Sequence, residues 1–260
     1  LICAAATALL VKCSYPRMSN YAWGWVALAP FIMGVVRVKK LWGAFIYSWF
    51  TAVLVYGGIF WWVYRTCYEG GGMSAAQSYG AWLGLSALIG LQFAFWGTSC
   101  FFLKKLKFLF PVLAACAWVA LEWLHQTIAF YGLGFPWFML GYSQWNFPHA
   151  IQIASLTGVY GVSFALAFTG VSLGYAFSAK AGFKGGVFQI LAAGLLFGGV
   201  CGYGNWKLSR PEHKSLLSMQ AAVMQPNIDQ YKKWSPQFEA EILATLQDMG
   251  AQLKDSGAML

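Results

Sequence analysis

Long apolar runs with almost no charged side chains constrain what this chain can fold into. Residues 41–64, 79–103, 150–178 and 185–206 contain no Lys, Arg, Asp or Glu, and residues 108–130 contain only Glu122. A helix of about 20 apolar residues is long enough to cross the roughly 30 Å hydrocarbon core of a bilayer. The runs therefore predict an α-helical integral membrane bundle.

Composition and charge distribution support the same class. Hydrophobic residues make up 59% of the chain and charged residues 10%, far below the roughly 25% charged of a soluble protein. The formal net charge is +9, but residues 207–260 carry six bases and six acids, so all of the excess lies at the ends of the apolar runs. This distribution is a topology signal, and we expect no nucleic-acid partner.

We expect about seven membrane segments in a transmembrane domain of residues 1–206. The first is too short to span, and the second is short and broken at Pro30. The chain begins inside one apolar run and stops as another begins, so we expect both ends to be cut. The segments are residues 1–11, 21–36, 41–64, 79–103, 108–130, 150–178 and 185–206.

Lys and Arg in alternate connectors predict the orientation of the bundle. One side carries eight bases and the other three, and the side richer in Lys and Arg faces the cytoplasm. Residues 132–145 and everything after residue 206 then lie on the outer face. The eight cytoplasmic bases are Arg37, Lys39, Lys40, Lys104, Lys105, Lys107, Lys180 and Lys184, and the three outer ones are Lys12, Arg17 and Arg65.

The polar stretch 207–260 predicts the beginning of an α/β unit. Residues 216–224 form a short apolar run typical of a buried strand, and residues 225–229 contain Pro226 and Asn227, which break it. Ser235 is a good N-cap for a helix with Pro236 at its first position. Apolar residues then recur at helical spacing up to Leu253, and we expect Gly257 to end this helix. The unit is too small to hold a core of its own.

The segment between two apolar runs, residues 132–145, is rich in glycine and aromatic residues and has no charge. Glycines and Pro136 disfavour a regular helix, and Trp and Tyr favour the membrane–water interface. We predict a re-entrant or interfacial loop, which membranes tolerate where protein or water covers it. An ordinary connector in the aromatic belt is the alternative.

Several short strings, in this order and spacing, resemble the apolipoprotein N-acyltransferase family, bacterial membrane enzymes that add the third acyl chain to lipoproteins. The resemblance covers nearly the whole chain. The most specific strings are Gly134-Phe-Pro-Trp137, Leu140-Gly-Tyr-Ser-Gln144 and Val223-Met-Gln-Pro-Asn227 followed by Lys233-Trp234. Weaker strings are Trp61-Trp-Val-Tyr64 with Gly71-Gly-Met73, Leu121-Glu-Trp-Leu124 and Gly158-Val-Tyr-Gly-Val-Ser-Phe164.

The resemblance implies a helical bundle carrying an outward-facing nitrilase-like α/β domain, of which residues 207–260 are the truncated start. It implies a Glu, Lys and Cys triad that moves an acyl chain from a phospholipid to the amine of a diacylglyceryl-modified N-terminal Cys. None of the six cysteines has a nitrilase setting, so we expect the triad to lie beyond residue 260 and this fragment to be inactive. It also implies a monomer in the bacterial inner membrane, with phospholipid, apolipoprotein and bilayer as partners and no cofactor.

The candidate substrate-binding residues are polar or aromatic groups near the outer face. Glu122 is the only acid inside an apolar span, where a carboxyl group is costly and marks a functional candidate; we expect it to hydrogen-bond to the 132–145 loop. Pro136 is expected to direct Trp137 and Tyr142 toward the substrate, although interface anchoring is the alternative for both rings. The full set is Glu122, Gly134, Phe135, Pro136, Trp137, Tyr142, Gln144 and Trp234.

Two of these candidates leave alternatives open. Trp234 follows two lysines in a polar loop, so it is either a lipid contact or a packing residue. Glu122 and His125 make half of a helical di-metal motif, but the second half is absent and the cysteines are scattered singly, so we expect no metal. Relatives carry Arg where this chain has His125, which puts head-group binding at that position in doubt.

Two other functions compete with the acyltransferase interpretation. A transporter or channel with a small outer domain would explain Glu122 and the many glycines, but such proteins usually carry internal repeats, and none is recognisable here. A related nitrilase-fold amidase would not explain seven apolar segments.

Overall fold

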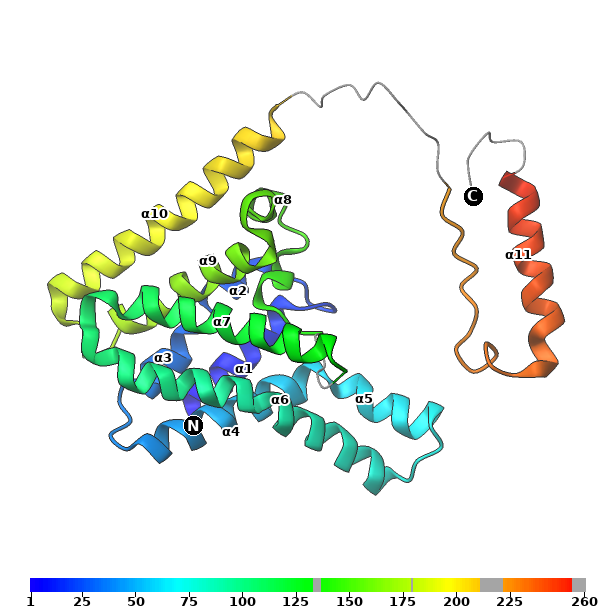
Figure 1. The fold of residues 1–260 in the computed structure, drawn as a ribbon, viewed down its shortest axis with the longest axis horizontal. Helices are drawn as coiled ribbons and strands as arrows, with labels where there is room; N and C mark the ends of the chain where they lie inside the picture. Colours follow the sequence, from blue (N-terminus) through cyan, green and yellow to red (C-terminus); the bar gives the residue numbers. More distant parts are fainter. Residues whose placement is uncertain (133–136, 179, 211–221, 254–260) are drawn as a thin grey trace.

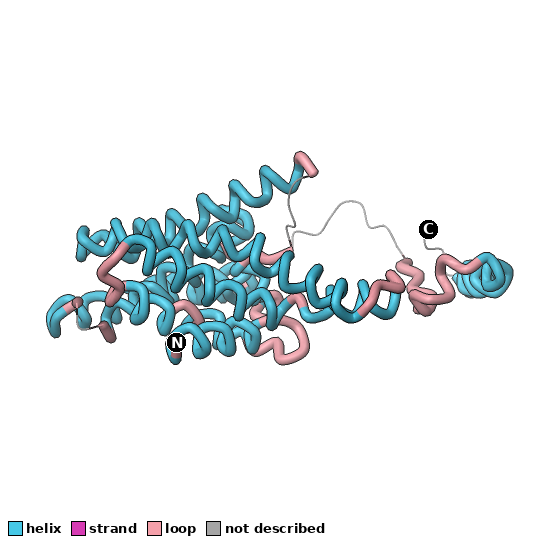
Figure 2. The backbone as a smooth tube through the Cα atoms, turned by 90° about the horizontal axis from the view of Figure 1, so that it is seen from below, coloured by secondary structure: helices cyan, strands magenta, loops and turns pink. Residues whose placement is uncertain are grey.

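The computed structural model describes residues 1–132, 137–178, 180–210 and 222–253. These residues form helices and loops, and the described part of the chain has no strand (Figure 2). The candidates Gly134, Phe135 and Pro136 lie outside the described residues.

The helices before the 132–145 loop form the first half of the bundle (Figure 1). Turns of other helical types follow α5 and α6: a π-helical turn, η1 (Thr66–Gly70), and a 3₁₀ turn, η2 (Lys104–Leu109). The α-helices are α1 (Ile2–Ser14), α2 (Tyr21–Val26), α3 (Ala29–Val35), α4 (Leu41–Ile59), α5 (Trp61–Arg65), α6 (Ala75–Leu103) and α7 (Phe110–Phe130).

The second half begins with a short 3₁₀ helix inside the 132–145 loop, η3 (Leu140–Gln144). Two long helices complete the bundle, and α10 packs against α8 and α9. A 3₁₀ turn, η4 (Pro236–Phe238), leads into the last helix. The α-helices of this half are α8 (Pro148–Ile151), α9 (Ala154–Ala176), α10 (Gly182–Leu208) and α11 (Glu239–Leu253).

Each expected segment forms helix, with breaks that the sequence pattern did not indicate. By length and composition, four helical stretches can cross a membrane: Leu41–Ile59, Ala75–Phe130, Ala154–Ala176 and Gly182–Leu208. The second contains both α6 and α7, which run side by side and are joined by η2 (Figure 1). The first two expected segments form shorter helices, α1 and the pair α2–α3.

Two breaks lie close to positions that matter for the site. The expected span 41–64 is divided at Phe60, whose φ of −94° and ψ of 18° end α4. Gly158, at φ 63°, interrupts α9, a backbone conformation open mainly to glycine. The break near Pro30 falls just before it, so Pro30 sits in the first turn of α3, where its missing N–H costs nothing.

Aromatic rings fill the middle of the bundle. Phe31 stacks on Trp96 at 5.0 Å, and Trp96 meets Trp118 edge to face at 4.7 Å. The indole Nε1 of Trp96 donates to the carbonyl of Ala114 at 2.8 Å, because a buried indole N–H needs an acceptor away from water. These contacts pack α3, α6 and α7 against one another in the middle of the bundle.

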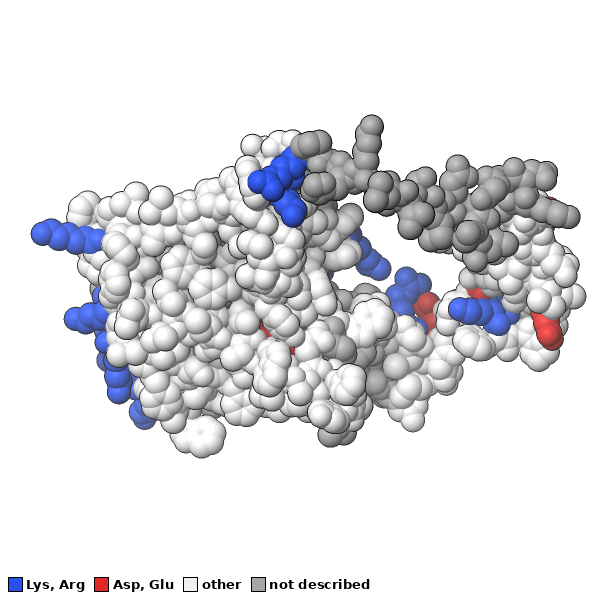
Figure 3. All heavy atoms as spheres, turned by 45° about the horizontal axis from the view of Figure 1, so that its top comes forward, with Lys and Arg blue, Asp and Glu red and all other residues white. Residues whose placement is uncertain are grey.

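Connectors rich in lysine and arginine meet at one end of the bundle (Figure 3). The Nζ of Lys104 donates to the carbonyl of Val38 at 2.6 Å, which ties η2 to the α3–α4 connector. The three basic connectors of the sequence prediction are those joining α3 to α4, α6 to α7 and α9 to α10.

The stretch after residue 206 confirms the predicted helix, whereas most of the predicted strand 216–224 lies outside the described residues. Residues 222–229 carry no regular secondary structure, and residues 211–221 and 254–260 lie outside the described residues, including the expected helix end at Gly257. The helix itself forms as expected, with Pro236 opening η4 before α11.

Candidate functional site

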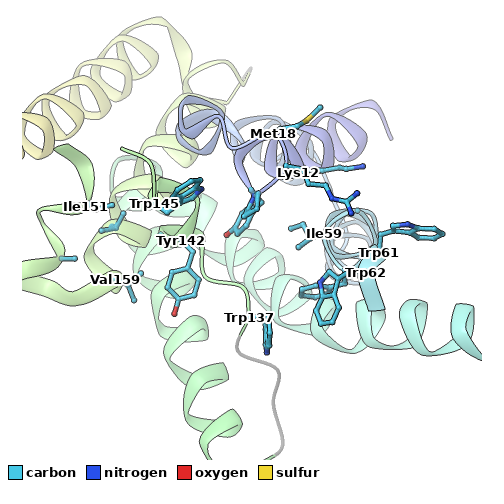
Figure 4. Close-up of a pocket in the computed structure, with 18 residues that line it drawn as sticks. Lys12, Met18, Ile59, Trp61, Trp62, Trp137, Tyr142, Trp145, Ile151 and Val159 are labelled. Carbon is cyan, nitrogen blue, oxygen red and sulfur yellow. The ribbon is translucent and has the colours of Figure 1, made fainter. Parts of the chain in front are cut away.

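A large cavity lies at the end of the bundle opposite the basic connectors (Figure 4). Its volume is about 780 Å³, within the range of sites for drug-sized ligands. Four parts of the chain surround it: the end of α1 with the following turn, the α4–α5 junction, the loop with η3, and α8–α9. The lining residues are Lys12, Tyr15, Pro16, Arg17, Met18, Gly58, Ile59, Phe60, Trp61, Trp62, Trp137, Gly141, Tyr142, Trp145, Ile151, Ala154, Val159 and Val162.

The loop segment that borders the cavity is fixed from three sides. The Tyr15 hydroxyl donates to the carbonyl of Met139 at 2.6 Å, and its ring stacks on Phe138 at 4.9 Å. The backbone N–H of Gly141 donates to the Ser163 hydroxyl at 2.9 Å. These bonds satisfy irregular backbone that would otherwise be costly at membrane depth, so α9 and the turn after α1 both hold the loop.

Glu122 is the third anchor and makes the contact predicted from the sequence. It is 1% exposed, and its Oε1 accepts from the backbone N–H of Leu140 at 2.7 Å and from Trp118 Nε1 at 2.7 Å. Its Oε2 is buried without a hydrogen-bond partner among the described residues. The expected hydrogen bond from Glu122 to the loop is confirmed, while a direct contact of Glu122 with substrate stays a prediction.

Large aromatic rings form the rim of the cavity. The rings of Trp62 and Trp137 lie 5.5 Å apart at an angle of 41°. Trp137 is 64% exposed and Tyr142 44% exposed, although both line the cavity. Figure 4 shows Tyr142 and Trp137 on the loop side and Trp61 and Trp62 on the α5 side. Trp137 and Tyr142 therefore line the cavity, while their contact with substrate stays a prediction.

The cavity also holds two basic side chains that the sequence analysis treated only as topology residues. Lys12 lies in the last turn of α1, and Arg17 lies in the turn that follows the helix. The ion pairs of the described residues involve neither of them, and the lining contains no acid. Their position beside the cavity depends on the turn of residues 15–20, which no periodicity in the sequence reveals.

Gln144 and Trp234 do not line this cavity. Gln144 is wholly buried, and it accepts from Trp25 Nε1 at 2.9 Å and donates to the carbonyl of Tyr21 at 3.0 Å. It thus joins η3 to α2. Trp234 is 78% exposed, and its neighbour Lys232 pairs with Glu241 at 3.0 Å. The Nζ of Lys233 lies 5.6 Å from the centre of the Trp234 ring. Lys233 is therefore the cation beside that ring.

His125 lies in a second, more open groove between α6 and α7. Its Nδ1 is 2.6 Å from Gln92 Oε1. The groove is otherwise apolar, with lining residues Leu85, Leu88, Ile89, Phe95, Leu121, Leu124, Ile128 and Gly132. His125 therefore takes no part in the aromatic cavity.

Among the described residues, a hydrogen bond links the 222–253 stretch to the bundle. The Tyr231 hydroxyl donates to Glu69 Oε2 at 3.1 Å, and Arg65 pairs with the same carboxylate at 3.0 Å. The Arg65 guanidinium and then the Tyr231 hydroxyl hold the pKa of Glu69 below its ordinary value. Because all three groups are exposed, this link contributes little to stability.

The described lining of the cavity combines apolar, aromatic and basic side chains. It contains no Cys, His, Asp or Glu. The described residues contain no group of three metal-ligating side chains. Apolar walls, an aromatic rim and two cations fit an amphipathic ligand with an acidic head.

The fold defines a polytopic helical membrane protein with an aromatic cavity at one end of its bundle. Comparison with known proteins places it more narrowly. Residues 7–172 match the family model described as the apolipoprotein N-acyltransferase N-terminal domain. The chain belongs to the apolipoprotein N-acyltransferase family.

Relatives from several bacteria agree with this assignment. The apolipoprotein N-acyltransferase of Geobacter metallireducens is 31% identical over 253 residues, which cover 93% of this chain and 46% of the relative. That of Allorhizobium ampelinum is 36% identical over 155 residues, covering 58% and 27%. That of Chlorobaculum tepidum is 27% identical over 247 residues, covering 92% and 43%. The chain spans less than half the length of these relatives.

Proposed function

We propose that this chain is the membrane part of an enzyme that moves an acyl chain from a phospholipid to the N-terminal amine of diacylglyceryl-cysteine in bacterial lipoproteins. The observation that carries the proposal is the aromatic cavity of about 780 Å³ with its two basic residues. The relatives are named apolipoprotein N-acyltransferases, and a phospholipid donor has the apolar chains and acidic head that this cavity suits.

The described contacts support a lipid-access role for the loop. Tyr15, Glu122 and Ser163 fix residues 139–141, while Trp137 and Tyr142 remain exposed at the rim. A two-chain lipid has to leave the bilayer sideways while its ester reaches a nucleophile near the interface. In this proposal Gly134, Phe135 and Pro136 set the direction of Trp137, and Trp234 forms a further lipid contact after the chain leaves the bundle.

Acyl transfer in this proposal uses a nucleophile outside the cavity. A thiolate attacks the ester carbonyl, lysophospholipid leaves, and the lipoprotein amine then attacks the thioester and releases the thiol. The six cysteines of this chain are free thiols, and none lines the cavity. We therefore propose that the Glu, Lys and Cys triad belongs to a nitrilase-like domain beyond residue 260.

The proposal includes a monomer in the inner membrane, with residues after 206 on its periplasmic side.

The test has two measurements on the purified 260-residue protein. Native mass spectrometry is expected to detect phospholipid that co-purifies with the chain. Trp137→Ala and Tyr142→Ala should reduce its amount about two- to tenfold. Trp42→Ala should not, because Trp42 is 74% exposed, begins α4 and lies outside the cavity lining.

The second measurement is acyl transfer to a diacylglyceryl peptide, for which we expect no product. Transfer by these 260 residues, or a thioester on any of their cysteines, would show that the catalytic residues are already present. Lipid that binds equally to all four proteins would refute the role of the cavity.

A further inference from the structure

We propose that Lys12 and Arg17 form the head-group subsite of the cavity and that they select glycerophospholipids with an anionic head group. This inference rests on the proposed function, because it assumes that the cavity holds a phospholipid. It names two residues and a class of lipid that the family assignment does not supply.

The first argument is the charge balance of the cavity. Lys12 and Arg17 both line it, and its lining contains no acid. The acids of residues 1–206 are Glu69 and Glu122. Glu69 pairs with Arg65 at 3.0 Å, and Glu122 is buried against the backbone of Leu140. Among the described residues, neither acid of residues 1–206 therefore neutralises Lys12 or Arg17, and an anionic ligand in the cavity could do so.

Packing against the α4–α5 junction positions the side chain of Lys12 beside the cavity. The aliphatic part of Lys12 lies over Gly58, where a Cβ added to the glycine would lie 3.4 Å from Lys12 Cδ. Figure 4 shows Lys12 extending across the cavity toward the α4–α5 junction near Ile59 and Trp61. A long basic side chain that packs its stem on the protein keeps its charged end at the water boundary. Lys12 is thus positioned at the level where a lipid phosphate lies.

Arg17 is held in a backbone conformation that is rare for its residue type. Its φ is 93°, in a region that side chains with a Cβ seldom adopt. Hydrogen bonds from Ser19 N to the carbonyl of Tyr15 at 2.9 Å and from Asn20 N to that of Cys13 at 3.1 Å close the turn around it. A glycine would suit this position better, so the arginine side chain has a use that offsets the unfavourable backbone. Such outliers gather at binding sites.

The charges that line the cavity also distinguish anionic from zwitterionic lipids. Every glycerophospholipid has a phosphodiester that two cations attract, but phosphatidylethanolamine also carries an ammonium group. The lining offers that ammonium no carboxylate, and the two cations repel it. Tryptophan faces can attract an ammonium group, although weakly at exposed sites. Phosphatidylglycerol has no ammonium and keeps the full attraction, so it is the favoured head group.

The experiment offers the purified chain equal amounts of phosphatidylglycerol and phosphatidylethanolamine with matched acyl chains and counts bound lipid by native mass spectrometry. The wild-type chain is expected to bind phosphatidylglycerol at least about threefold more. Lys12→Gln and Arg17→Gln should each reduce phosphatidylglycerol binding roughly two- to fivefold, as expected for exposed charge pairs. Arg17→Glu should reverse the preference by offering the ammonium group a carboxylate.

Two further variants keep the result independent of folding. Arg17→Gly removes the cation but suits the positive φ, so it should lose the lipid preference without a lower melting temperature. Arg65→Gln removes a cation that already pairs with Glu69 and does not line the cavity, and it should keep the wild-type preference.

Each alternative outcome has a distinct meaning. Equal binding of the two lipids by the wild-type chain would overturn the head-group inference and leave the proposed function intact. Binding of neither lipid would refute the proposed function. Displacement of bound lipid by millimolar inorganic phosphate, with no difference between head groups, would make the site one for free phosphate and would also overturn the inference.

Discussion

Glu122 shows how one side chain can stabilise irregular backbone inside a membrane bundle. Its Oε1 accepts from Trp118, one turn earlier on α7, and from Leu140 at the start of η3. Both donors are buried, and a buried N–H without an acceptor costs about 1–3 kcal/mol. Glu122 therefore fixes the loop to α7 rather than simply occupying an apolar helix.

The first prediction concerns this carboxylate. Glu122→Ala leaves the N–H groups of Trp118 and Leu140 without their acceptor and is expected to lower the free energy of unfolding by about 1–3 kcal/mol for each. Glu122→Gln keeps an oxygen at the same place and should cost less. Thermal unfolding in detergent measures both changes. Equal melting temperatures for wild type and Glu122→Ala would show that the bonds do not stabilise the loop.

The contacts of individual residues could be predicted from the sequence only in part. A lone acid in an apolar run has to find donors, so its bond to the loop could be predicted from burial cost alone. The positions of Lys12 and Gln144 could not. Lys12 carries the same charge signal whether it faces lipid head groups or a cavity, and Gln144 bonds to Trp25, which lies far away in the sequence.

At the scale of elements, η3 packs very closely against α9. A Cβ added to Gly141 would lie 2.8 Å from Val159 Cγ2 and 2.9 Å from the carbonyl oxygen of Val159. The second contact is with backbone, which cannot move aside without shifting the helix. Gly158, just before Val159, has a positive φ that bends α9 at this point. Gly141 of one motif and Val159 of the other therefore meet in one close contact beside the cavity.

The second prediction tests this contact. Gly141→Ala should destabilise the protein by about 1–3 kcal/mol, the usual cost of overpacking, and should reduce lipid binding because the cavity wall shifts. Gly80→Ala is the matched control: a Cβ there meets nothing within 4 Å, and alanine favours the helix. Thermal unfolding and bound-lipid counts of both variants give the comparison. A Gly141→Ala protein as stable as the control would contradict the close packing.

Element type was predictable from the sequence, but element ends were less so. Charge-free runs predict helices because only helices satisfy their own backbone within lipid. The break at Phe60 lies in the apolar run Ile59-Phe-Trp-Trp62, where neither proline nor charge marks it. The predicted strand 216–224 stays a prediction, because its residues 216–221 lie outside the described residues.

At the scale of the whole molecule, charge separates the two ends of the bundle. The connectors that carry eight of its bases lie together (Figure 3), and Lys104 bonds across them to Val38. The opposite end has the aromatic rim and the cavity with Lys12 and Arg17. Alternation of helices predicted this separation from the sequence, because each full span reverses the chain.

The last prediction is the orientation in the membrane, which follows from this separation. Lys and Arg in short connectors are retained on the cytoplasmic side, so the α6–α7 turn should face inward and the cavity outward. A reporter that is active only in the periplasm, fused after Arg210 beyond α10, should be active. The same reporter fused after Lys105 in η2 should be silent, and a cytoplasmic reporter should give the opposite pattern. Replacing Lys104, Lys105 and Lys107 by Gln should weaken the asymmetry and yield a mixed population. Cytoplasmic activity of the Arg210 fusion would place the cavity on the inner face, away from periplasmic lipoproteins, and would contradict both the orientation and the proposed acceptor.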